Sequence, residues 1–215
     1  LVKSSAASDV YKRQRFTSFI RFSAHVIAMT QVMALIDANN FYASCEQSLD
    51  PALIGRPVVV LSNNDGCIVA RSAEARALGI AMGTPYFKAK RHLEQNNVVI
   101  RSSNYALYAD MSQRLMSLLE SQVEDLEIYS IDEAFARLSR PSDGNLHPWA
   151  QQLRTLARRN LGLPIAIGLG ASKGQAKLAN RLAKVVPANA GLFDLGLCRE
   201  PDRWLETISI EDVWG

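Results

Sequence analysis

Short apolar runs bounded by turn residues recur along the chain and predict the strands of a sheet. Two pairs of runs are close enough in sequence to form hairpins. VVVL (58–61) and CIVA (67–70) flank the turn sequence NNDG, and EIYS (127–130) and EAFARL (133–138) flank a tight turn. The other predicted strands are MALIDA (33–38), VVIRSS (98–103), IAIGLG (165–170) and LFDL (192–195).

Longer segments between these strands repeat their apolar residues at helical spacing. They cover 72–79, 105–122, 149–162 and 172–184. Ser172 is suited to cap the last of these helices, and Pro187 ends it. In the helix at 105–122, the face predicted to be buried consists of Leu107, Met111, Leu115 and Leu118.

The order of elements predicts an α+β fold. When the segment 49–104 is treated as an insertion, the remainder follows a βαββαβ order, which is the ferredoxin-like arrangement with helices on one face of a mixed sheet. Residues 1–32 are rich in Ser and Arg and precede the first strong strand signal at Met33. We expect them to be a non-native or unstructured leader, which comes from sequence upstream of a natural start at Met33 or Met29.

The composition excludes several classes of protein. The 215 residues are 48% hydrophobic and 21% charged, which is typical of a globular protein and not of a disordered or fibrous one. No apolar run approaches the ~20 residues needed to span a bilayer. The three cysteines are odd in number and far apart, which favours reduced thiols in the cytoplasm over disulfides or a zinc site.

The charge distribution is more informative than the net charge of +3. No Asp or Glu occurs from Gly144 to Phe193, a stretch that contains Arg154, Arg158, Arg159, Lys173, Lys177, Arg181 and Lys184. In the helix at 172–184, four of these cations lie within an arc of roughly 80°. The stretch indicates a surface that faces phosphate groups, with a solvated basic helix face as the alternative.

Three acids at predicted strand ends indicate a metal site. Asp132 and Glu133 are adjacent in YSIDEAF (129–135), where a hairpin turn would let neighbouring side chains converge. Asp37 closes another apolar strand. Such carboxylates suit Mg²⁺, and two such ions can act on both oxygens of an in-line displacement at phosphorus. The alternative is a pair of solvated turn acids.

Three further residues have both a functional and a structural interpretation. Phe41 and Tyr42 directly follow the Asp37 strand, so one of them would flank the sugar of a substrate, although aromatic residues are more often core residues. Arg76 follows the first hairpin and would clamp a phosphate, or would instead pair with a nearby acid such as Glu74.

Five segments in order resemble the Y-family DNA polymerases: DANNFYASCE, VVVLSNNDGCIVARSAEARALGI, SSNYALYADMS, YSIDEAF and AKLANRLAK. They are closer to the polymerase V branch than to the polymerase IV branch. The resemblance implies a right-hand architecture in which 33–48 and 105–191 form a palm, 49–104 form a small α/β fingers insertion, and 192–215 begin a thumb. We expect this thumb to be truncated.

The resemblance also implies roles for single residues. Asp37, Asp132 and Glu133 match the catalytic carboxylates that bind two Mg²⁺ ions, with the Ala38 carbonyl as a backbone ligand. Tyr42 matches a steric gate that lies under the deoxyribose and disfavours a 2′-hydroxyl. Arg76 and Lys184 match contacts to the triphosphate. The segment that covers the nascent base pair is matched by Cys67, Ile68 and Val69. Ala70 and Ala73 depart from the family pattern, because some relatives have a hydroxyl and a tyrosine there.

The function that the resemblance implies is error-prone translesion DNA synthesis in the SOS response. Its substrates would be primer–template DNA and dNTP, and UmuD′ and RecA would be partners of the intact protein. Two other classes stay open: a non-catalytic polymerase-like scaffold that binds DNA, and another two-metal palm enzyme such as a nucleotide cyclase. The presence of all three acids argues against the scaffold, and the fingers-like insertion argues against the cyclase.

Overall fold

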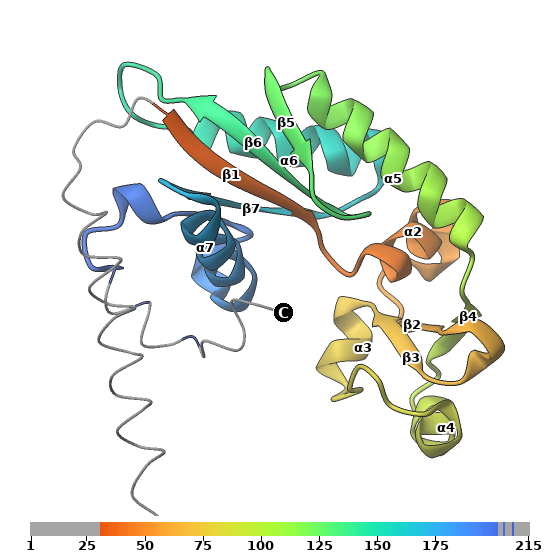
Figure 1. The fold of residues 1–215 in the computed structure, drawn as a ribbon. Coiled ribbons are helices and arrows are strands. Elements are labelled where there is room, and N and C mark those ends of the chain that lie inside the picture. Colours follow the sequence, from red (N-terminus) through yellow and green to blue (C-terminus); the bar gives the residue numbers. More distant parts are fainter. Residues whose placement is uncertain (1–30, 202–203, 205–207, 209–215) are drawn as a thin grey trace, which may run out of the picture. The chain divides into compact units, whose positions relative to one another are not determined.

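The computed structural model describes residues 31–201, 204 and 208, drawn in Figure 1. The chain separates into two compact units. In its described part, one unit contains residues 31–35, 137–146 and those from 167 on, and the other contains 36–136 and 147–166. The predicted leader lies outside the described residues, apart from its last two positions. These two begin the first strand, β1 (Gln31–Ala38), which therefore starts earlier than Met33.

A five-stranded sheet has the order β5-β6-β1-β7-β8. Its other strands are β5 (Asp125–Ile128), β6 (Glu133–Ser139), β7 (Ile165–Gly170) and β8 (Leu192–Asp194). The first four strands have the ferredoxin-like order, and β8 pairs in parallel with β7 beyond them. Helices α5 (Tyr105–Glu120) and α6 (His147–Leu161) pack together beside the sheet (Figure 1). The predicted α+β class and βαββαβ order are confirmed.

The phase of α5 differs from the prediction. Its buried residues are Tyr108, Met111, Leu115, Met116 and Leu119, whereas Leu107 and Leu118 are only half-buried. Apolar residues occupy adjacent positions on this helix, so the sequence leaves several faces almost equally apolar. Packing against α2 (Phe41–Leu49), α6 and β5 selects the face that contains Tyr108.

A second, three-stranded sheet lies wholly within the predicted insertion and has the order β3-β2-β4. Strands β2 (Val58–Leu61) and β3 (Ile68–Arg71) form the predicted antiparallel hairpin, and β4 (Val99–Ser102) runs parallel to β2. Helices α3 (Ala73–Ala77) and α4 (Tyr86–Gln95) enclose a core of their own with this sheet. Short 3₁₀ turns occur at Pro51–Leu53, Asn63–Asp65, Pro187–Asn189 and Leu195–Leu197. The palm and fingers boundaries stay a prediction.

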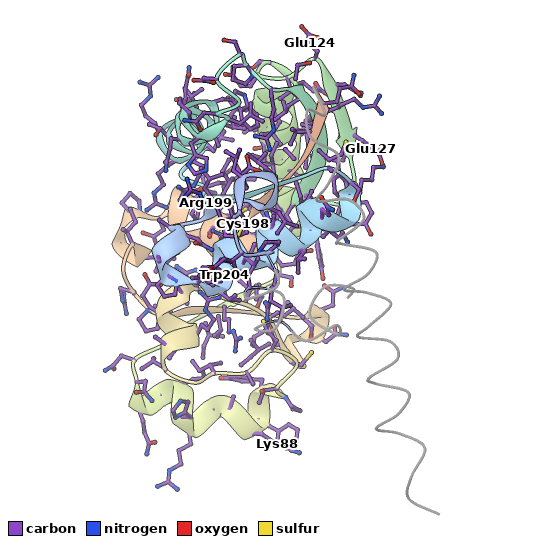
Figure 2. All side chains as sticks on the ribbon, turned by 90° about the vertical axis from the view of Figure 1, so that its left-hand side faces the viewer. Lys88, Glu124, Glu127, Cys198, Arg199 and Trp204 are labelled. Atoms are coloured by element: carbon purple, nitrogen blue, oxygen red, sulfur yellow. The ribbon has the colours of Figure 1, made fainter. Side chains whose placement is uncertain are left out.

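Strand β5 is an edge of the large sheet, and its acidic residues keep this edge polar. Asp125 and Glu127 are exposed, and Figure 2 labels Glu127 together with Glu124 just before the strand. Charges on an edge strand oppose pairing with another chain. Among the described residues, we find no helix with the length and apolarity that a membrane crossing requires.

Two glycines let helix α7 (Lys173–Val185) approach strand β7 very closely. A Cβ atom at Gly168 would overlap the backbone nitrogen of Asn180 and the carbonyl oxygen of Ala176. One at Gly170 would lie 2.9 Å from the nitrogen of Ala176. Because backbone atoms cannot swing aside as a flexible side chain can, only glycine fits these positions.

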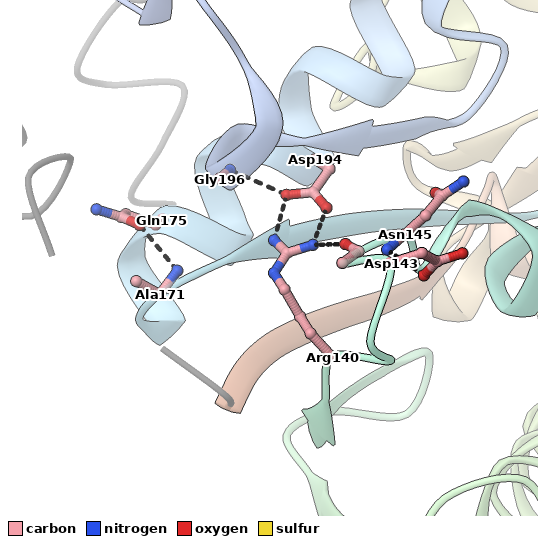
Figure 3. A network of polar contacts seen from close by, with 8 residues as sticks. Arg140, Asp143, Asn145, Ala171, Gln175, Asp194 and Gly196 are labelled. Atoms are coloured by element: carbon pink, nitrogen blue, oxygen red, sulfur yellow. Dashed lines mark hydrogen bonds and ion pairs between the residues drawn. The ribbon is translucent and has the colours of Figure 1, made fainter. Parts of the chain in front are cut away.

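A buried ion pair closes the connection after β6. Arg140 donates 2.8 Å hydrogen bonds to both carboxylate oxygens of Asp194, and its Nη1 also donates to the carbonyl of Gly144, as Figure 3 shows. The backbone nitrogen of Gly196 donates to Asp194 as well. The Asp194 side chain is only 1% exposed, so its charge depends on these donors.

We expect Gly168→Ala to destabilise the protein by about 3 kcal/mol, because the added methyl group meets backbone on both sides. The free energy of unfolding in denaturant measures this effect. Gly174→Ala is the matched control on α7, where the nearest atom to a new Cβ is 4.0 Å away. This control should be neutral or stabilising by up to about 1 kcal/mol, because alanine favours the helix. Equal stability of the two variants would contradict the close approach.

We expect Arg140→Met to cost about 3–5 kcal/mol of stability, because it leaves the Asp194 charge buried without its guanidinium partner. Arg114→Met is the control, because its ion pair with Asp110 joins two exposed side chains. Such a pair contributes only about 0.2–1 kcal/mol. Thermal unfolding of both variants compares the costs, and a loss for Arg140→Met as small as that of the control would refute the buried pair.

Candidate functional site

The end of strand β1 meets the tip of the β5–β6 hairpin. The backbone nitrogen of Ala38 donates a 2.9 Å hydrogen bond to the carbonyl oxygen of Asp132, and that of Asn39 donates a 2.8 Å bond to the carbonyl of Pro164. Asp37 directly precedes this junction and is 7% exposed. The end of β1, which contains Asp37, therefore lies beside the hairpin tip that contains Asp132 and Glu133.

Ser130 organises the hairpin tip. Its hydroxyl donates to Oδ1 of Asp132 at 2.8 Å and accepts from the backbone nitrogens of Asp132 and Glu133 at 3.3 and 3.1 Å. The nitrogens of Tyr129 and Ser130 both donate to the carbonyl of Glu133 at 3.0 Å. Four residues, 129–132, connect the strands, so the connection is longer than the two-residue turn that the sequence favours. Asp132 belongs to this connection, and Glu133 begins β6.

The donors at this junction have the chemistry that a hard divalent cation requires. They are carboxylates and a backbone carbonyl, with no thiol or imidazole among them. Within the described residues, however, no three His, Cys, Asp or Glu side chains are close enough together to hold a metal ion. The backbone thus brings the acidic positions to one edge, while their side chains do not form a finished cluster.

An aromatic group lies beside the acids, on α2 and α5. Phe41 is 4% exposed and is a core residue, whereas Tyr42 is half-buried, so Tyr42 is the one that retains a surface for a ligand. The Tyr42 ring stacks on Tyr108 with centroids 4.2 Å apart and an interplanar angle of 11°. Burial raises the pKa of Tyr42, and the nearby groups of Tyr105 and Asp132 raise it further.

The same charge of Asp132 affects Cys45. Burial raises the pKa of this thiol to about 12, and the charges of Glu46 and Asp132 add to the rise. The thiol is therefore protonated at neutral pH and is a weak nucleophile. Its sensitivity to Asp132, shared with Tyr42, indicates that the Asp132 carboxylate is near α2.

A chain of polar contacts that the sequence does not reveal links α2, α5 and β4. The Tyr108 hydroxyl donates to Oε1 of Glu46 at 2.8 Å. Arg101 lies 3.7 Å from Oε2 of Glu46 and 3.3 Å from Oδ2 of Asp50. The motif SSNYALYADMS contains Tyr108, but no periodicity distinguishes this tyrosine from Tyr105.

The cations predicted to contact a triphosphate are placed in different parts of the chain. Arg76 is exposed on α3, and it forms no ion pair with Glu74 in the described structure. Lys184 is half-buried on α7, which belongs to the other compact unit. Their roles stay predictions.

The arginines of α6 donate hydrogen bonds to groups in the helix or in the residues that follow it. Nε of Arg154 donates to the carbonyl of Ile165, and burial lowers the pKa of Arg154. Arg158 donates to the carbonyl of Gly162, and Arg159 donates to the side chain of Asn160. Part of the basic stretch therefore stabilises the end of α6 and the loop after it.

Comparisons with known proteins agree on one family. A family described as the impB/mucB/samB family matches residues 36–181. Protein UmuC of Salmonella typhimurium is 48% identical over 186 residues, and MucB of Escherichia coli is 42% identical over 185 residues. Each match covers 86% of this chain but 44% of the relative. DNA polymerase IV of Corynebacterium diphtheriae is 39% identical over 153 residues, which are 69% of this chain and 34% of the relative.

Solved structures show the same fold. DinB from Sulfolobus solfataricus matches with a TM-score of 0.70 and 25% identity, covering 86% of this chain and 53% of that chain. An insertion ternary complex of Dbh DNA polymerase matches with a TM-score of 0.71 and 24% identity, covering 86% and 54%. The chain spans less than half the length of these curated relatives and about half the length of these structures.

We expect Ser130→Ala to lower the free energy of unfolding by about 1–2 kcal/mol, because the hairpin tip loses the acceptor for two backbone nitrogens. Denaturant unfolding measures the loss. Ser142→Ala is the control, because Ser142 is exposed in a loop and its hydroxyl makes no hydrogen bond in the described structure. A change within about 0.5 kcal/mol is normal for such a surface site. The same small change at Ser130 would show that its hydroxyl does not organise the tip.

Proposed function

Because this chain belongs to the impB/mucB/samB family, we propose that it is the catalytic palm and fingers part of a Y-family DNA polymerase. The observation that carries the proposal is the hydrogen bond between Ala38 and Asp132. It joins the strand end at Asp37 to the hairpin that contains Asp132 and Glu133, which is the backbone arrangement that a two-metal site with three carboxylates needs.

The proposed reaction is template-directed nucleotidyl transfer. The 3′-oxygen of a primer attacks the α-phosphorus of a dNTP, a new phosphodiester bond forms, and pyrophosphate leaves. Asp37, Asp132, Glu133 and the Ala38 carbonyl would hold two Mg²⁺ ions. Bound magnesium makes the attacking oxygen a better nucleophile and neutralises charge on the leaving pyrophosphate.

The residues of the chain have distinct tasks in this reaction. Ser130 orients the Asp132 carboxylate by donating to one of its oxygens. Tyr42 lies under the deoxyribose, where a 2′-hydroxyl would collide with its ring. Arg76 and Lys184 contact the triphosphate, and residues 67–69 cover the nascent base pair.

The biological setting follows from the relatives. UmuC and MucB are similar over most of this chain, which supports error-prone translesion synthesis during the SOS response as part of DNA repair. The intact protein would act in the cytoplasm on primer–template DNA, with UmuD′ and RecA as partners. A non-catalytic scaffold is the second candidate, and the presence of all three acids disfavours it.

We expect Asp132→Ala to reduce extension of a primed template by at least about a hundredfold, because a lost charge-stabilising group commonly costs that much. Steady-state incorporation of dNTP with Mg²⁺ measures the effect. The control is Asp143→Ala, in an exposed loop where the carboxylate accepts a hydrogen bond from the backbone nitrogen of Asn145. Extension by Asp132→Ala at the rate of the unaltered protein would refute the proposed site.

A further inference from the structure

We propose that Tyr108, held by Glu46 and Arg101, is a positioning residue that fixes the ring of Tyr42 and thereby sets the discrimination between deoxyribonucleotides and ribonucleotides. The inference rests on the proposed function and deepens it. It assigns to α5 and β4 a part in sugar selection, which otherwise depends on Tyr42 alone.

The first support is the geometry of the aromatic group. Tyr108 covers one face of Tyr42 in a nearly parallel stack. Tyr105 meets both rings edge-on, with centroids 6.2 Å from Tyr42 and 6.1 Å from Tyr108. A rotation of the Tyr42 side chain would break the stack and the edge contact together. The orientation of this ring is thus set by two neighbours from one helix.

The second support is that Tyr108 is itself immobilised. Its side chain is 0% exposed, and its hydroxyl donates to Glu46. Burial raises the pKa of Tyr108, so the phenol keeps the proton that this hydrogen bond needs. Glu46 lies on α2, one helical turn after Tyr42. The supporting ring is therefore tied to the same helix as the ring that it supports.

The third support is the continuation of the contacts to Arg101 on β4. This arginine is near both Glu46 and Asp50, although its side chain and that of Asp50 are partly exposed at 38% and 44%. Partly exposed ion pairs are weak. Arg101 should therefore matter less than Tyr108, and the largest effect is expected where the stack is removed.

The ring of Tyr42 must be held in place because the two substrates that it distinguishes differ very little. A ribonucleotide differs from a deoxyribonucleotide by a single oxygen atom. A ring that can tilt away would admit this atom, whereas functional geometry must be held to within about 0.5 Å to be selective. Packing of the ring face against a fixed neighbour removes that tilt.

The experiment uses the full-length protein on a primed template and measures kcat/KM for dCTP and for CTP opposite the same guanine. The variants are Tyr108→Leu, which removes the stack, Tyr108→Phe, which removes only the hydrogen bond, Tyr42→Ala, and the double variant Tyr42→Ala/Tyr108→Leu. Leu115→Ala is the control, because it loosens the same helix at a fully buried position that lies about two turns from Tyr108. Circular dichroism verifies folding.

We expect the preference for dCTP over CTP to fall by about three- to tenfold in Tyr108→Leu, the range for a lost aromatic pair. Tyr108→Phe should lose about twofold, as one modest hydrogen bond allows. Tyr42→Ala should lose more than either, and the double variant should lose no more than Tyr42→Ala, because Tyr108 acts through Tyr42. Leu115→Ala should keep the preference even if its kcat falls.

Three results would overturn the inference while the proposed function stands. They are an unchanged preference in Tyr108→Leu, an equal loss in Leu115→Ala, and a further loss in the double variant beyond Tyr42→Ala. If Tyr108→Leu does not fold, an unchanged preference for dCTP over CTP in Tyr108→Phe overturns the proposed positioning of Tyr42 by Tyr108. An unaltered protein that incorporates no nucleotide at all would refute the proposed function, and the inference with it.

Discussion

The candidate site is positioned by one backbone hydrogen bond, from the nitrogen of Ala38 to the carbonyl of Asp132. It joins two chain segments almost a hundred residues apart, at the position where one strand ends and a hairpin turns. Because strands pair along their backbones, this bond also fixes which side chains share the sheet edge. The acids can serve one substrate only if this register holds.

The two faces of the site are built differently. On the acidic side, the tip of the hairpin is held by one hydroxyl, that of Ser130, which orients Asp132 without filling the site. On the aromatic side, Tyr42 is held by a stack and a chain of polar contacts that pass through Tyr108 and Glu46. Within the described residues, the acidic side chains form no finished cluster, whereas the ring of Tyr42 already has a stacked neighbour in Tyr108.

Two other features stabilise the fold away from the candidate site. The glycines of β7 let α7 lie against the sheet, and the pair of Arg140 and Asp194 closes the segment after β6. The two glycines, Arg140 and Asp194 have no proposed role in the reaction, although α7 also contains Lys184. Asp132 and Tyr42 belong to neither feature, so changes at these two residues need not disturb this part of the scaffold.

Much of this protein was determined by the sequence alone. Apolar runs and turn residues predicted the strands, and the βαββαβ order and the strand-end acids followed from them, because burial and backbone geometry act locally along the chain. The phase of α5, the four-residue tip at 129–132 and the pairing of Tyr108 with Glu46 were decided only by the tertiary structure. Several faces of α5 are similarly apolar, and Tyr108 and Glu46 lie far apart in sequence. Only the packing of one element on another chooses between such alternatives, and no local pattern records that choice.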